Sequence, residues 1–197
     1  MFTLINPNKP KSSRDQIKLK GVRNDILILS DNSYRLVLQV TPINFELKSE
    51  AEQDAIIDNY QKFLNALPCS IQIIFRTRAM DLDSYLNSFT DQANNDQIKN
   101  YSYFVKQLVA DNKILSRSFY LIIPLTSQDS LDIDNANQQL KVFEDIVKKG
   151  LDQIGIKSRR LSGLEILDLF YSFYSPEQAK TQSISEQTLK LINQAYI

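Results

Sequence analysis

Histidine is absent from the 197 residues, which include one cysteine, no tryptophan and four glycines. Without imidazole, Ser-His-Asp and Cys-His catalysis and the usual histidine-containing zinc sites are excluded. The single thiol, Cys69, can form neither an intramolecular disulfide nor a cysteine metal cluster, and a reducing, cytoplasmic location fits this cysteine usage. We interpret Cys69 as a small buried side chain, because the chain has no histidine to activate it.

The four glycines are too scattered for a phosphate-binding loop, which needs clustered glycines before a helix start. Carboxylate chemistry is the remaining catalytic option, and Asp81 and Asp83 are its best candidates. Two carboxylates at a predicted helix start are more typical of stabilisation of the free amides there. We therefore predict a protein that is not an enzyme, and we assign no catalytic residue, cofactor or metal.

The chain also lacks net charge and long apolar runs. Lys plus Arg and Asp plus Glu both number 23, so no whole-molecule field attracts nucleic acid or anionic membrane. The longest apolar run, 119–125, is far shorter than the roughly 20 residues of a membrane-spanning helix. The segment 1–10 does not resemble a secretory signal. Any membrane contact is expected to be peripheral, at the inner face.

Length and composition favour one globular domain, preceded by a basic segment. With 43% hydrophobic residues, the chain can bury a sizeable core. Residues 1–20 are polar and basic and show no helical or strand period, which predicts a flexible arm. Residues 21–197 are expected to form the domain.

Hydrophobic periodicity predicts the order of the elements within this domain. In chain order these are strands 26–29 and 34–41 forming a hairpin, a helix 49–67, a strand 70–78, one long helix or two over 81–109, a strand 119–123 ended by Pro124, a loop 127–134, a helix ending at Ile154, a short edge strand 157–161, a helix 162–175 and a short terminal helix in 185–196. Ser49 with Glu52, and Ser162 with Glu165, are spaced as capping boxes. The helix 49–67 is expected to connect strands 34–41 and 70–78 as a right-handed crossover. The prediction is an α/β (α+β) domain with a mixed sheet covered by helices.

Two groups of side chains are candidates for binding. The aromatic residues of the helix 162–175 extend around more of its surface than one buried face needs, which is typical of a partner interface; they are Phe170, Tyr171, Phe173 and Tyr174. A basic patch is the second candidate, and its residues are Lys18, Lys20, Arg23, Arg159 and Arg160. These basic residues form either a solvated face or a site for nucleic acid or lipid headgroups.

Order and spacing over most of the chain give a family resemblance. The residues that carry it are Gly21 to Leu29, Tyr34-Arg35, Leu38 to Val40, Ile43 to Phe45, Ser49-Glu50, Glu52-Gln53, Tyr60, Phe63 to Asn65, Ile71 to Ile73 and Leu161 to Pro176. This pattern resembles the TraC-like amino-terminal domain of the ATPases that energise conjugation and type IV secretion. The family's ATPases continue into a motor domain, and the sequence reaches Ile197 without motor motifs.

The resemblance implies a stand-alone or split-off module whose role is assembly. Its expected partners are a separate conjugative-transfer ATPase motor and a small inner-membrane subunit, which it would connect. ATP hydrolysis is not carried over, because no catalytic residue of the family has a matching position. The alternative is a nucleic-acid-binding module that uses the basic arm with Arg159 and Arg160.

Overall fold

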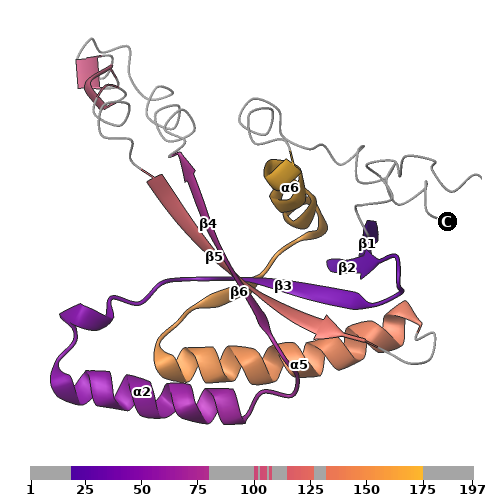
Figure 1. Cartoon of the computed structure of the whole chain (residues 1–197), viewed down its shortest axis with the longest axis horizontal. Helices are drawn as coiled ribbons and strands as arrows, with labels where there is room; N and C mark the ends of the chain where they lie inside the picture. Colours follow the sequence, from indigo (N-terminus) through magenta and orange to yellow (C-terminus); the bar gives the residue numbers. More distant parts are fainter. Residues whose placement is uncertain are drawn as a thin grey trace, which may run out of the picture.

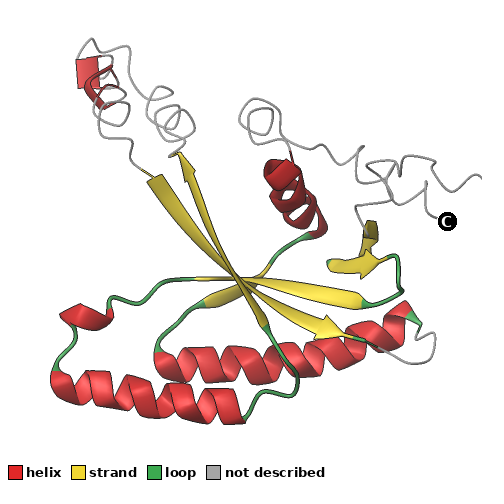
Figure 2. Cartoon of the chain, viewed as in Figure 1, coloured by secondary structure: helices red, strands yellow, loops and turns green. Residues whose placement is uncertain are grey.

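The computed structural model describes residues 19–79, 115–126 and 132–174, together with helical residues 100, 101, 103–105 and 107. Within these ranges a six-stranded sheet carries helices on both faces (Figure 1, Figure 2). The predicted class, a helix-and-sheet domain, is confirmed. The arm residues 1–18, most of the predicted helical stretch 81–109 and the terminal helix 185–196 lie outside the described residues, and the arm's flexibility stays a prediction.

The strands follow the order β1-β2-β3-β5-β4, and β6 also pairs with β3. Their bounds are β1 Leu19–Arg23, β2 Ile26–Leu29, β3 Tyr34–Val40, β4 Gln72–Ala79, β5 Leu115–Leu125 and β6 Ser158–Arg160. Every pairing among these strands is antiparallel, whereas the sequence predicted a mixed sheet. The reason is that β5 lies between β3 and β4, so the two strands joined by the helical crossover are not neighbours.

The hairpin of β2 and β3 forms as predicted, but β1 was missed. Asn24 and Asp25 both have positive φ, at 53° and 57°, as a tight two-residue hairpin turn between β1 and β2 requires. After β2, the Asp31 carboxylate accepts hydrogen bonds from the Ser33 amide and hydroxyl. These bonds lower the pKa of Asp31. Stabilisation of the turn therefore explains why an aspartate occupies this position. Since β1 starts at Leu19, Lys20 belongs to the sheet.

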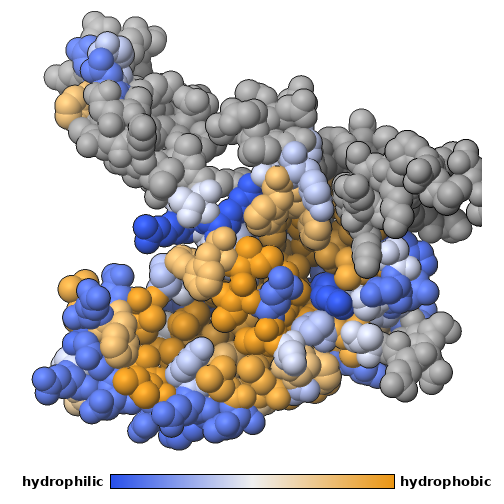
Figure 3. All heavy atoms as spheres, in the orientation of Figure 1, coloured by the Kyte–Doolittle hydropathy of each residue, from blue (hydrophilic) through white to orange (hydrophobic). Residues whose placement is uncertain are grey.

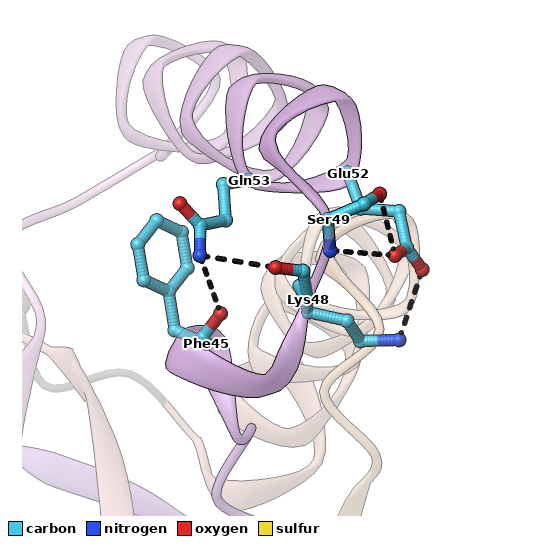
Figure 4. A network of polar contacts seen from close by, with 5 residues as sticks. All are labelled: Phe45, Lys48, Ser49, Glu52 and Gln53. Carbon is cyan, nitrogen blue, oxygen red and sulfur yellow. Dashed lines mark hydrogen bonds and ion pairs between the residues drawn. The ribbon is translucent and has the colours of Figure 1, made fainter.

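Helix α2, Glu50–Asn65, begins at the predicted capping box. The Glu52 carboxylate accepts from the Ser49 amide at 3.0 Å and from its hydroxyl at 2.8 Å (Figure 4). Gln53 donates to the carbonyls of Phe45 and Lys48, which attaches the short 3-10 helix η1, Phe45–Leu47, to α2. Hydrogen bonds from Ser49, followed by the ammonium of Lys48, lower the pKa of Glu52 to about 2.

The sheet face under α5 carries the larger core. Helix α5, Ile133–Ile154, packs on β3 and β5, and α2 packs against α5. The N-cap of α5 is Asp132, so this helix begins inside the predicted loop 127–134. At its other end Gly155, with φ 91°, ends α5 as predicted. This core includes Leu36, Leu38, Phe63, Leu121, Ile123, Leu140 and Val147.

The opposite sheet face is covered by α6, Gly163–Tyr174. Ile166, Leu167 and Leu169 pack there on residues that include Val22, Leu27 and Val37, and Tyr120 and Ile122 of β5 border the same cluster. The segment 120–123 of β5 therefore packs against a core on each face, as the apolar run predicted. The strand continues one residue past Pro124, because the pairing with β4 ends at Ile122 and the missing proline amide is not needed on that edge.

Candidate interaction surfaces

The start of α6 is fixed by side chains from three parts of the chain. Glu165 accepts from the Ser162 amide at 2.8 Å, which confirms the second capping box. The Asp25 carboxylate accepts from the Gly163 amide at 2.7 Å, and Arg159 forms an ion pair with Glu165 at 2.7 Å. Burial acts to raise the pKa of Glu165, but the hydrogen bonds from Ser162 and Arg159 outweigh it, and the pKa is lowered.

The last described turns of α6 are held by Arg76 of β4. This arginine is 8% exposed and donates to the carbonyl of Leu169 at 3.2 Å and to the carbonyl of Ser172 at 2.6 Å. It also donates to the Ser172 hydroxyl, which in turn donates to the Leu169 carbonyl. These hydrogen bonds attach the last described turns of α6 to β4.

The predicted aromatic interface is divided between core and solvent. Phe170 and Tyr171 are half-buried, and Phe170 packs on the α6 core. Phe173 and Tyr174 are 50% and 60% exposed at the end of the helix. The Arg76 guanidinium lies 4.4 Å from the centre of the Phe173 ring, which orients that ring by a cation–π contact. The exposed pair Phe173 and Tyr174 is the α6 surface.

The structure does not bring the predicted basic residues to one surface. Lys18 lies outside the described residues, Lys20 donates to Asn32, and Arg23 is exposed at the end of β1. Arg159 and Arg160 are adjacent on β6, so their side chains leave opposite faces of the sheet. Arg159 lies beside Gln39 and Glu165 on the α6 side.

Arg160 is held on the α5 side. It forms an ion pair with Glu144 at 3.3 Å and donates to the carbonyl of Asn24 at 2.9 Å. Glu144 also pairs with Lys148 at 2.6 Å. Each of the two neighbouring arginines therefore has a carboxylate partner, which reduces its availability to a phosphate.

The residues considered for catalysis or metal binding form no such site in the described part of the chain. Asp81 and Asp83 lie outside the described residues. Cys69 is half-buried, and this burial raises the pKa of its thiol, which favours the unreactive form. Within 19–79, 115–126 and 132–174, no group of three or more His, Cys, Asp or Glu could hold a metal ion. None of the described helices is long and apolar enough to cross a membrane.

Comparison with known proteins supplies the family. The archaeal TraC-like domain family matches residues 20–188, which includes the β1–β2–β3 segment, α2 and α6. The chain belongs to this family. The resemblance predicted from the residue pattern is thereby confirmed.

One curated relative of this TraC-like domain is the DNA import protein CedB of Sulfolobus acidocaldarius, which is 24% identical over 180 residues. The alignment covers 81% of the chain and 29% of that protein, so the chain spans less than a third of its length. No solved structure matches the chain significantly.

Sequence reasoning missed the two residues that attach α6 to the sheet in this TraC-like domain. Asp25 precedes the predicted strand 26–29, and Arg76 alternates with Ile71, Ile73 and Phe75 in the predicted strand 70–78, so neither was a candidate. In the structure Phe75 is 70% exposed and Arg76 is buried. The signal available in the sequence was an arginine within the alternating pattern of strand 70–78. Burial of an arginine is favourable only when its guanidinium contacts polar groups.

Proposed function

We propose that this TraC-like domain is a non-catalytic assembly subunit of a conjugation or type IV secretion apparatus that moves DNA. In this role it connects a separate motor ATPase to the inner-membrane part of the channel, from the cytoplasmic side. Family membership and the relative named as a DNA import protein support the link to DNA transfer. The proposal assigns no catalytic residue and no cofactor.

The α6 surface carries the proposal. Phe173 and Tyr174 are exposed on a helix that Asp25 fixes at its start and Arg76 holds in its last described turn. Rigid exposed aromatic side chains give large contact area at low entropic cost, so they are typical anchors of protein interfaces. We assign the contact with the motor ATPase to this surface.

The experiment is a pull-down from cells that express the transfer operon, with the tagged full chain as bait. We expect the motor ATPase to be recovered by the wild-type chain and lost with the double variant Phe173→Ser, Tyr174→Ser. Val142→Ser is the matched control, because Val142 is 57% exposed on α5, which packs on the opposite sheet face. Recovery of neither the motor nor the small membrane subunit by the wild-type chain would overturn the proposal.

The nucleic-acid alternative stays a prediction with a direct test. Binding of single- and double-stranded DNA should weaken steeply with salt if cationic side chains hold the phosphates. Because Arg159 and Arg160 each pair with a carboxylate, no geometry among the described residues favours this alternative over assembly.

A further inference from the structure

The sheet face that carries α5 continues, still apolar, beyond the helices that cover it. Ile73 and Phe75 of β4 are opposite Leu121 and Phe119 of β5 in the antiparallel register, so they lie on the same face as the buried Leu121. Ile73 is 49% exposed and Phe75 is 70% exposed. The rings of Phe75 and Phe119 meet edge to face with centroids 5.4 Å apart. This part of the face is ordered by its own contacts and remains open to solvent.

Helix α2 borders the same region with an exposed apolar stripe. Ile57, Tyr60 and Leu64 are 44%, 44% and 45% exposed, and their spacing places them on one side of the helix. The adjacent Phe63 is buried in the α5 core. The β4–β5 pair rises away from α2 in Figure 1, and Figure 3 shows an apolar area running from α2 and α5 to the strands. We call Ile57, Tyr60, Leu64, Ile73 and Phe75 the α2–β4 face.

A row of carboxylates follows the apolar stripe along α2. Glu50, Asp54 and Asp58 are exposed and spaced by four residues, so they form one line on the helix surface. Asp54 is also three residues before Ile57, which makes the acidic row a direct neighbour of the stripe. The helix carries four acidic side chains against one lysine, Lys62. A partner that covers the stripe therefore meets negative charge at its edge.

The geometry of this layer favours a helix as the partner. A helix is about 10 Å wide and strands are spaced about 4.8 Å apart, so one helix covers about two strands. Helix α5 already lies on β3 and β5, whereas the outer strand β4 keeps two apolar side chains exposed. The spacing of Ile57, Tyr60 and Leu64 is that of an apolar stripe on one side of a helix, against which another helix packs.

We propose that the α2–β4 face binds a basic amphipathic helix of a partner protein. Its apolar side contacts Ile73 and Phe75 together with the α2 stripe, and its lysines or arginines face Glu50, Asp54 and Asp58. This assignment goes beyond the proposed function and does not depend on it, because the α6 surface belongs to the opposite side of the sheet. The partner's helix then lies beside α5 and α2 on the same side of the sheet.

The test uses two designed helical peptides of about five turns. Both carry the same leucine stripe, one with lysines and the other with glutamates on its polar side, and binding to the full chain is measured by fluorescence anisotropy. We expect the basic peptide to bind at least about tenfold more tightly than the acidic one, with an affinity that falls as salt rises. Equal binding of the two peptides would overturn the proposal.

Variants locate the binding on the chain. Ile73→Ser with Phe75→Ser should weaken the basic peptide at least about tenfold, because the apolar anchors are lost. Asp54→Lys with Asp58→Lys changes only exposed side chains and should remove the preference for the basic peptide. The control, Phe173→Ser with Tyr174→Ser, should bind normally even if the motor pull-down fails. Unchanged binding by both test variants would overturn the proposal, as would a dimer in light scattering that Ile73→Ser with Phe75→Ser converts to a monomer.

Discussion

Arg76 combines burial, a positive charge and contact with the helix α6 in a single residue. Its guanidinium donates to the carbonyls of Leu169 and Ser172 and lies against the Phe173 ring. Hydrogen bonds from a charged donor contribute about 1.5–3 kcal/mol each, although their effects do not simply add. The residue thus connects the edge strand β4 with the helix that presents the aromatic surface.

We expect Arg76→Met to lower the free energy of unfolding by about 2–4 kcal/mol, since it removes the hydrogen bonds that attach α6 to β4. Urea unfolding followed by circular dichroism measures this loss. Arg117→Met is the matched control, because Arg117 is exposed on the neighbouring strand opposite Thr77. Its effect should stay within about 0.5 kcal/mol. Equal stability of the two variants would argue against a stabilising role for the contact between Arg76 and α6.

Gly150 is a second residue whose role follows from contact rather than from its own backbone. It lies inside α5, where alanine is ordinarily better by about 1 kcal/mol. A methyl group at this position would overlap the ring of Phe63 from α2. Glycine is therefore the residue that lets α2 and α5 approach closely.

We expect Gly150→Ala to destabilise the domain by about 1–3 kcal/mol in spite of its better helix propensity. Thermal unfolding of the single variant and of Gly150→Ala with Phe63→Leu measures the effect, and the smaller side chain should recover part of the loss. Lys149→Ala, at the exposed neighbouring position, should be close to neutral. A stabilising Gly150→Ala would show that the helices can separate at no cost.

At the scale of elements, the helix starts are the places where pH should act. The folded-state pKa of Glu52 is lowered from 4.5 to about 2 by Ser49 and Lys48. In this range the unfolded chain binds more protons than the folded one. The contribution of the α2 capping box is therefore fully present above pH 4.5 and is lost as the pH falls to about 2.

We expect Glu52→Gln to lower the urea midpoint at pH 7 and to have a smaller effect at pH 3. The reason is that the wild-type capping box has then lost part of its ionic advantage. Midpoints of both chains at the two pH values test this directly. A difference between wild type and variant that is the same at both pH values would contradict the assignment of the pKa shift to folding.

In the part of the chain that the structure describes, the α6 surface and the α2–β4 face point in opposite directions. The α6 surface lies on the side of the sheet that α6 covers, and the α2–β4 face lies on the side that α5 covers. Since the sheet separates them, two partners can bind at the same time. An assembly subunit that connects two other proteins requires such an arrangement.

We expect saturating basic amphipathic peptide to leave recovery of the motor ATPase in the pull-down unchanged. The measurement compares the captured motor with and without the peptide, using the acidic peptide as the control. Competition between the basic peptide and the motor would show instead that both use one surface, and it would contradict the division of roles between the two faces.

The sequence by itself determined the features that depend on residues close along the chain. Both capping boxes join residues three apart, and Gly155 ends α5 by its own backbone freedom. The apolar run of β5 predicted burial on both faces for the same local reason. Family membership also followed from the sequence, because the order and spacing of residues over a long span can be recognised without knowledge of the fold.

Only the tertiary structure decided which face of each strand meets a helix and which strands are neighbours. Alternation along β4 shows that Phe75 and Arg76 point in opposite directions, but the positions of α2 and α6 decide that the arginine is buried and the phenylalanine exposed. The insertion of β5 between β3 and β4, and the separate carboxylate partners of Arg159 and Arg160, depend likewise on residues far apart in sequence. Local periodicity carries no information about such contacts, because each is the outcome of packing the whole chain.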